Sequence, residues 1–328
     1  MVSLVEKKAS PEQTVVILGG NSIFYGFGQN SEDLWSLSLQ QMLGDGYAVF
    51  NFAMPSSDPF EGAYWAAEAL LKKHRKVIYA TIAHPATTGF PEGSDVYGYA
   101  YWDAHEKHLL VHDKVRDTVV SARVAGHNPL KQQKLFDLQL RAVLDSIFYF
   151  EDLWTAIGYS NFFTVWTEPT AASPLKARKG YPGETYQLVP IEQRFKAEFC
   201  KAVKRDYRLC FESKTTQPNP EFWALMTKKA EMLTPSVFKR NCIVAVSAPM
   251  PRYMGFLSQM DRTRETVAAD ASRKAWSAAG YHEMGFGNKM TDDDYADMVH
   301  LSASGGKKLA ALVADKVRSL AFELAYVR

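Results

Sequence analysis

The sequence is poor in cysteine, and its three cysteines follow no recognisable spacing. Cys200, Cys210 and Cys242 include no C-x-x-C pair among the 328 residues. Three thiols without paired spacing indicate neither a disulfide framework nor a zinc knuckle. We therefore expect at least one unpaired thiol and no cysteine-held metal.

The sequence also lacks an excess of charge of one sign. Its 38 Lys and Arg residues nearly balance 36 Asp and Glu residues, which leaves a formal net charge of +2. Such a balance gives no reason to expect a surface that binds nucleic acid or an acidic membrane. We expect no nucleic-acid partner and no electrostatic attachment to a membrane surface.

Long hydrophobic runs are missing as well. No apolar stretch reaches the roughly 20 residues that a membrane-spanning helix needs. The first residues, MVSLVEKKASPEQ, contain no apolar segment of the kind found in signal peptides. We expect no transmembrane segment and no signal peptide. The chain also contains no internal repeat and no low-complexity segment.

What the sequence does contain is material for a sizeable core. Hydrophobic residues make up 47% of the chain and charged residues 23%, which is typical of a globular protein. The length favours one large domain, or one domain with a large insertion, over several small ones.

Short β-branched runs alternate with helical patterns near both ends of the chain. Three strands and two helices are predicted in the first 85 residues, and a strand and two helices in the last 90; their ranges are 14–20, 30–44, 47–53, 58–74, 76–83, 241–251, 256–279 and 302–324. Ser31, Asp58 and Ser302 are expected to cap three of the helices, with Pro59 at a first helical position. This order predicts an α/β fold, a three-layer α/β/α sandwich around a parallel sheet.

The α/β pattern breaks in the middle of the chain. Residues 85–235 hold several helical stretches separated by loops rich in Pro, Gly and Thr. We therefore expect a core made of 1–84 and 236–328, interrupted by a mostly helical insertion or lid.

Ser22 follows two glycines and an asparagine, directly after the first predicted strand. Three interpretations compete for this serine: a phosphate-binding turn, a helix cap or a nucleophile. The glycines at 19, 20, 26 and 28 do not have the G-x-G-x-x-G or P-loop spacing, and no lysine follows. A capping serine would explain Ser22 alone.

A second motif near the other end favours the nucleophile. Asp297 and His300 stand three positions apart before the final predicted helix. A nucleophilic serine needs a base for its proton and an acid that orients the base. The loops after parallel strands open at one edge of the sheet, where such groups meet. Asp293 and Asp294 are alternative acids whose spacing from His300 is less suitable.

Four segments resemble the SGNH (GDSL-like) hydrolase family. LGGNSI (18–23) resembles its first block, with Ser22 as the nucleophile, and VFNFAMPSS (49–57) its second. VIYATIAHP (77–85) occupies the place of the third block, and DMVHLSASGGKKLA (297–310) is similar to the D-x-x-H-L block. The likeness covers both ends of the chain, and the large insertion resembles that of surface-polymer acyl-transfer proteins.

The resemblance implies a catalytic triad of Ser22, His300 and Asp297, with no cofactor and no metal. It also implies an oxyanion hole made by the N–H groups of Ser22 and Ser56, together with a side chain after the third strand. The family has a glycine where Ser56 stands, and a Gly-x-Asn-Asp segment that is absent here. His84 is the nearest polar side chain and is expected as the third donor.

The function implied is a serine-dependent esterase acting on an acylated carbohydrate or another small ester. Two alternatives stay open: an O-acyltransferase that modifies a surface polysaccharide, and a non-catalytic binding protein on a decayed scaffold. The missing Gly-x-Asn-Asp favours the last, and the retained triad opposes it. The resemblance implies an extracytoplasmic location if a leader has been removed, and a cytoplasmic one otherwise.

Two further clusters favour ordinary structural roles. His105, His108 and His112 would share one helix face, where a metal site is conceivable, but their charged neighbours favour a solvated surface. Eight aromatic residues between 148 and 166 could line an acyl or sugar pocket. Such a cluster more often forms the core of its own segment.

Overall fold

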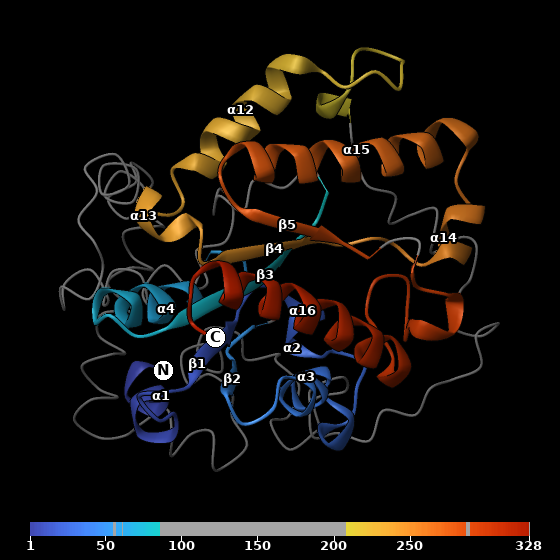
Figure 1. Cartoon of the computed structure of the whole chain (residues 1–328). Helices are drawn as coiled ribbons and strands as arrows, with labels where there is room; N and C mark the ends of the chain where they lie inside the picture. Colours follow the sequence, from blue (N-terminus) through green and yellow to red (C-terminus); the bar gives the residue numbers. More distant parts are fainter. Residues whose placement is uncertain (55–56, 61, 86–207, 287–288, 328) are drawn as a thin grey trace, which may run out of the picture. The chain divides into compact units, whose positions relative to one another are not determined.

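A computed structural model shows that the described residues form a five-stranded parallel sheet in the order β2-β1-β3-β4-β5 (Figure 1). The structure describes residues 1–54, 57–60, 62–85, 208–286 and 289–327, which all belong to one compact unit. The strands are β1 (Thr14–Leu18), β2 (Tyr47–Asn51), β3 (Val77–Ala83), β4 (Cys242–Val246) and β5 (His282–Gly285). The predicted α/β fold with a parallel sheet is confirmed.

Helices cover both faces of this sheet and make three layers. One face carries α2 (Ser22–Tyr25), α3 (Trp35–Leu43) and α16 (Ala303–Glu323), and the other carries α1 (Val2–Lys8), α4 (Ala63–Lys72) and α15 (Gln259–Ala278). The central strands β1, β3 and β4 are buried along their whole length. Their unbroken Val, Ile and Ala runs suit a strand that is covered on both faces.

Alternate residues of β1 and β3 belong to different faces. Val16, Leu18 and Ile78 lie in one core cluster with side chains of α3 and α16, such as Leu39 and Val313.

Tyr79 points to the opposite face, where aromatic rings fill the space under α4 and α15. Its ring lies 5.3 Å from Tyr64 and 5.6 Å from Phe60, whose ring also stacks on Trp276 at 5.9 Å. The side-chain alternation of a strand thus places two separate packing layers around one sheet.

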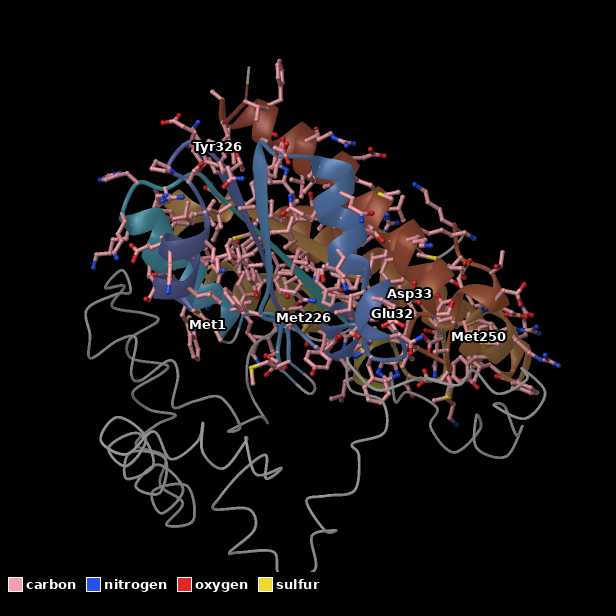
Figure 2. All side chains as sticks on the ribbon, turned by 90° about the horizontal axis from the view of Figure 1, so that it is seen from below. Met1, Glu32, Asp33, Met226, Met250 and Tyr326 are labelled. Carbon is pink, nitrogen blue, oxygen red and sulfur yellow. The ribbon has the colours of Figure 1, made fainter. Side chains whose placement is uncertain are left out.

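The carboxyl ends and the amino ends of the parallel strands lie at opposite ends of this unit. Met250 follows β4 at the carboxyl edge, and its N–H donates to Met298. Tyr326 lies at the amino edge, where its hydroxyl contacts the Asn241 side chain at 2.7 Å. Figure 2 shows these two labelled residues far apart, with Glu32 and Asp33 toward the Met250 end.

Two helices begin later than the sequence predicts. A 3₁₀ turn, η1 (Ser31–Asp33), precedes α3, whose first flanking residue is Leu34, so the predicted cap at Ser31 is wrong. The helix α4 begins at Ala63 rather than at Pro59. The carbonyl of Pro59 accepts hydrogen bonds from two hydroxyl groups of β3, which hold this segment outside the helix.

The predicted cap of the last helix is confirmed. Ser302 flanks α16, and its hydroxyl accepts a hydrogen bond from the N–H of Gly305. The other elements among the described residues are η2 (Arg208–Cys210), α12 (Pro220–Glu231), α13 (Ser236–Lys239), α14 (Pro251–Gly255) and η4 (Asp292–Asp294). The strand β5 was not predicted, because HEMG is half-buried and has no β-branched residue.

The described part of 85–235 packs on α15. Trp223 and Met226 of α12 contact Ala268 and Ala275 of α15, and the Nε atom of Arg264 donates to Thr215 at 2.8 Å. Residues 86–207 lie outside the described residues, so the insertion with its limits at 85 and 235 stays a prediction. No helix among the described residues is both long and apolar enough to cross a membrane.

Candidate active site

Ser22 lies at the carboxyl edge of the sheet, immediately after β1. Gly20 has a φ of +94°, and a Cβ atom on it would lie 2.7 Å from the hydroxyl of Thr81 in β3. Only glycine combines this dihedral with so close an approach. Asn21 then flanks α2, and its Oδ1 atom accepts a hydrogen bond from Ile23 N–H at 3.0 Å. The chain therefore turns sharply from strand to helix with Ser22 on the first helical position.

His300 and Asp297 lie on a short loop that closes on itself before α16. The N–H of Ala296 donates to the carbonyl of His300 at 2.8 Å, and Tyr295 forms a bridge with Leu301. Asp297 holds the tip of the loop, because its Oδ1 atom accepts from Val299 N–H at 2.9 Å and from His300 N–H at 2.8 Å. The loop therefore has a defined conformation without a regular element.

The three side chains form a continuous hydrogen-bonded series. The Oγ atom of Ser22 lies 2.8 Å from Nε2 of His300, and Nδ1 of His300 lies 2.6 Å from Oδ2 of Asp297. A carboxylate can only accept, so the proton of a neutral imidazole lies on Nδ1. The lone pair of Nε2 is then directed at the hydroxyl of Ser22, which is the arrangement that a general base requires.

The Asp297 carboxylate is charged in this arrangement. Burial raises its pKa, but the hydrogen bond and the charge of His300, with the two backbone N–H groups, outweigh burial and hold the pKa below its ordinary value. Its side chain is 36% exposed and that of His300 is 17% exposed. Asp297 is therefore ionised at neutral pH and accepts the hydrogen bond from Nδ1 of His300.

The two alternative acids lie in other surroundings. Asp294 accepts hydrogen bonds from Lys308 Nζ at 2.6 Å, from Thr291 and from Ser304, and its side chain is buried. Asp293 is exposed. Asp294 ties the loop that carries His300 to α16, whereas Asp297 contacts the imidazole.

The segment after α2, residues 27 and 28, packs against the loop that carries His300. The ring of Phe27 lies 4.5 Å from that of His300 at an angle of 43°. Gly28 has a φ of +91°, and a Cβ atom there would lie 2.7 Å from Cβ of Ala296 and 3.1 Å from the carbonyl of Leu301. This contact was not predicted, although the glycines at 26 and 28 were a signal of a tight turn.

Of the two oxyanion donors expected besides Ser22, the structure describes His84 but not Ser56. Ser56 lies outside the described residues, so its role stays a prediction. His84 is half-buried at the end of β3, and its two ring nitrogens lie 3.2 Å from Nδ2 of Asn21 and 2.9 Å from Oγ of Ser247. Neither Asn21 nor Ser247 was predicted to belong to the site.

The two other predicted clusters also lie outside the described residues. These are the histidines at 105, 108 and 112 and the aromatic residues between 148 and 166. Among the residues that the structure describes, no group of three His, Cys, Asp or Glu side chains is placed to hold a metal ion.

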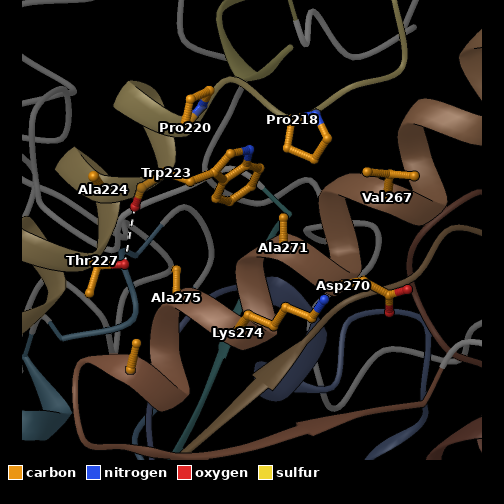
Figure 3. A pocket seen from close by; sticks show the side chains of 11 residues that line it. Pro218, Pro220, Trp223, Ala224, Thr227, Val267, Asp270, Ala271, Lys274 and Ala275 are labelled. Carbon is orange, nitrogen blue, oxygen red and sulfur yellow. Dashed lines mark hydrogen bonds between the residues drawn. The ribbon is translucent and has the colours of Figure 1, made fainter.

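A groove of about 680 Å³ lies between α12 and α15 (Figure 3). Its lining is mainly apolar, with Pro218 and Trp223 on one side. The hydroxyl of Thr227 donates to the carbonyl of Trp223, and Asp270 and Lys274 are its charged lining residues. The lining has neither a histidine nor a serine nor a cysteine, so it contains no Ser–His or Cys–His pair.

No protein-family model and no curated protein matches the chain. Among solved structures, it is similar to the native aryl esterase of M. smegmatis, with 13% identity over 94% of this chain and 99% of that chain and a TM-score of 0.35. A carbohydrate acetylesterase from Sinorhizobium meliloti gives 13% identity over 94% and 100% of the chains, again with a TM-score of 0.35. Identities and TM-scores at this level establish no function for this chain.

Proposed function

We propose that the protein is a serine hydrolase of the SGNH type that cleaves carboxyl esters through an acyl-enzyme on Ser22. The observation that carries the proposal is the series Ser22–His300–Asp297, with atom separations of 2.8 and 2.6 Å. A base with its lone pair on a serine hydroxyl, and a carboxylate behind it, is the arrangement that activates a nucleophile.

The first half of the reaction forms the acyl-enzyme. The Ser22 oxygen attacks the ester carbonyl carbon while its proton passes to Nε2 of His300. The imidazolium is stabilised by Asp297, whose pKa lies below its ordinary value. The tetrahedral intermediate collapses, the carbon–oxygen bond to the alcohol breaks, and His300 gives the proton to the leaving alkoxide.

The second half restores the enzyme. A water molecule attacks the acyl carbonyl, gives its proton to His300 and releases the carboxylic acid as Ser22 regains a proton. During both halves the negative oxygen is bound by N–H groups, for which we propose those of Ser22 and Ser56. Oxyanion donors of this kind each contribute about 10²–10³ in rate.

For the substrate we propose a small ester or an O-acylated carbohydrate, on the resemblance of the four sequence blocks. The same acyl-enzyme supports an alternative reaction, in which a sugar hydroxyl replaces water. The two reactions differ only in the acceptor, so they use the same three side chains.

Hydrolysis of p-nitrophenyl acetate by the wild type and by Ser22→Ala tests the proposal. We expect turnover by the wild type and a loss on the order of 10³-fold or more in Ser22→Ala. Ser277→Ala is the matched control, because Ser277 is exposed on α15; it should keep wild-type activity. Full activity in Ser22→Ala would overturn the proposal.

The time course separates hydrolysis from transfer. Linear release of many equivalents of p-nitrophenol per protein chain supports hydrolysis. A burst of one equivalent followed by a stall supports the acyltransferase alternative, because the acyl-enzyme then waits for an acceptor other than water. Absence of both a burst and turnover favours the non-catalytic binding protein.

A further inference from the structure

Hydrogen bonds join the ends of three strands beside Ser22. Asn21 follows β1, His84 follows β3 and Ser247 follows β4. Nδ2 of Asn21 lies 3.2 Å from Nε2 of His84, and Nδ1 of His84 lies 2.9 Å from Oγ of Ser247. Asn21 and Ser247 are only 7% and 1% exposed. This series of residues is separate from the contacts that connect Ser22 to His300.

The contacts of Asn21 determine where the protons of this series lie. A backbone N–H can only donate, so the amide atom that faces Ile23 N–H is the oxygen. The other end of the amide is then the NH₂ group, which can only donate to Nε2 of His84. Nε2 therefore carries the lone pair, and a neutral His84 has its proton on Nδ1, from which it donates to Ser247.

This proton arrangement gives His84 a different role from the one expected from the sequence. An oxyanion donor at Nε2 would need a proton on that atom, and the same proton would face the NH₂ group of Asn21. We propose that His84 is a positioning residue. Its Nε2 atom accepts a hydrogen bond from the Asn21 amide and so holds the turn that carries Ser22. This proposal rests on the proposed function of Ser22 as the nucleophile.

The amide of Asn21 transmits the constraint directly. Its oxygen holds the N–H of Ile23 in the first turn of α2, and its nitrogen is held by His84, which Ser247 fixes in turn. Releasing the nitrogen lets the residue before Ser22 rotate. Because the nucleophile must lie within a narrow distance of the acyl carbon, a shift of about 1 Å there costs up to about 10² in rate.

A double-mutant cycle separates positioning from oxyanion binding. Asn21→Ser keeps a side-chain oxygen that can cap α2 but removes the amide donor. His84→Ala removes its acceptor. If His84 acts through Asn21, each variant lowers kcat/KM for p-nitrophenyl acetate about tenfold, and the double variant loses about the same tenfold rather than about a hundredfold. Additive losses would overturn the proposal.

Two kinds of control accompany the cycle. His74→Asn changes an exposed histidine with a φ of +60°, a conformation that asparagine tolerates, and should keep full activity. His84→Gln offers a carbonyl to Asn21 and should recover most of the activity. His84→Asn is too short to do so and should resemble His84→Ala. Equal losses in the Gln and Asn variants would contradict positioning through Asn21.

The tautomer of His84 gives a test that does not depend on activity. Long-range ¹H–¹⁵N correlation spectra of the histidine-labelled wild type, assigned with His84→Gln, distinguish a ring protonated on Nδ1 from one protonated on Nε2. We expect the Nδ1–H form, and the Nε2–H form would overturn the proposal. If wild-type Ser22 is unreactive while His84 is in the Nδ1–H form, the proposed function fails and the assignment of His84 as an acceptor stands.

Discussion

Asp297 binds His300 at two points. Its Oδ1 atom accepts the backbone N–H of His300 at 2.8 Å, and its Oδ2 atom lies 2.6 Å from Nδ1 of the same residue. Oδ1 also accepts the N–H of Val299 at 2.9 Å. One carboxylate thus fixes both the backbone and the imidazole of the proposed base, and each of its oxygens has a separate task.

This division of tasks predicts a large effect of Asp297→Asn. The two backbone N–H groups require the amide oxygen at the Oδ1 position, which turns the amide NH₂ toward Nδ1 of His300. Nδ1 must then accept, so the imidazole proton moves to Nε2, and Nε2 can no longer take the proton of Ser22. We expect kcat for p-nitrophenyl acetate to fall on the order of 10³–10⁴-fold.

Asp293→Asn is the matched control for this change. Asp293 is exposed and precedes Asp297 by four positions, so its variant should keep wild-type kcat. A loss in Asp293→Asn as large as that in Asp297→Asn would contradict the assignment of Asp297 as the orienting acid.

The ion pair between Asp294 and Lys308 predicts a dependence of stability on pH. Burial raises the pKa of Asp294, but hydrogen bonds from Lys308, Thr291 and Ser304 outweigh burial and hold the pKa below its ordinary value. A carboxyl group whose pKa is lowered by folding stabilises the fold above its unfolded pKa. That contribution is lost as the pH falls through the lower, folded pKa.

We therefore expect Asp294→Asn to lower the free energy of unfolding by about 1–3 kcal/mol at pH 7. The difference between wild type and variant should narrow as the pH falls below about 4, where the carboxyl of the unfolded wild type begins to protonate. Urea unfolding at several pH values measures both quantities. A difference that is independent of pH would contradict the role of the charged carboxylate.

Gly28 predicts an effect of a single methyl group on the site. A Cβ atom at this position would lie 2.7 Å from Ala296, and its φ of +91° is unfavourable for alanine. We expect Gly28→Ala to displace the His300 loop, to lower kcat at least tenfold and to destabilise the fold by about 1–3 kcal/mol.

Gly46→Ala controls for the substitution itself. A Cβ atom on Gly46 would meet nothing within 4 Å, so we expect a change in stability within about 0.5 kcal/mol and an unchanged kcat. Wild-type kinetics in Gly28→Ala would show that the loop tolerates displacement, contrary to our account.

Local pattern was enough to predict most of the sheet. Strands β1, β3 and β4 are apolar runs buried on both faces, which is the strongest signal that a strand can give. The strand β5 escaped because HEMG has mixed polarity and each of its residues is half-buried. The late start of α4 depends on hydroxyl groups of Tyr79 and Thr81 that hold Pro59. No property of the local sequence reveals such a contact.

In the site too, some residues were predictable from the local sequence and others depend on contacts that only the fold creates. Ser22 and the Asp297–His300 pair were predicted because each belongs to a short motif whose chemistry is recognisable. The partners of His84 were not, since Asn21 and Ser247 lie 63 and 163 positions away in the chain. Only the fold brings these three side chains together, and the contacts of Asn21 indicate which nitrogen of His84 carries the proton.

Covalent labelling of Ser22 tests the central claim most directly. A serine-directed fluorophosphonate is incubated with the wild type, with Ser22→Ala and with Ser277→Ala, and peptides are mapped by mass spectrometry. We predict one phosphonyl group per chain on the peptide that contains Ser22 in the wild type and in Ser277→Ala, and none in Ser22→Ala. An unlabelled wild type, or a label that persists in Ser22→Ala, would contradict the assignment of Ser22 as the nucleophile.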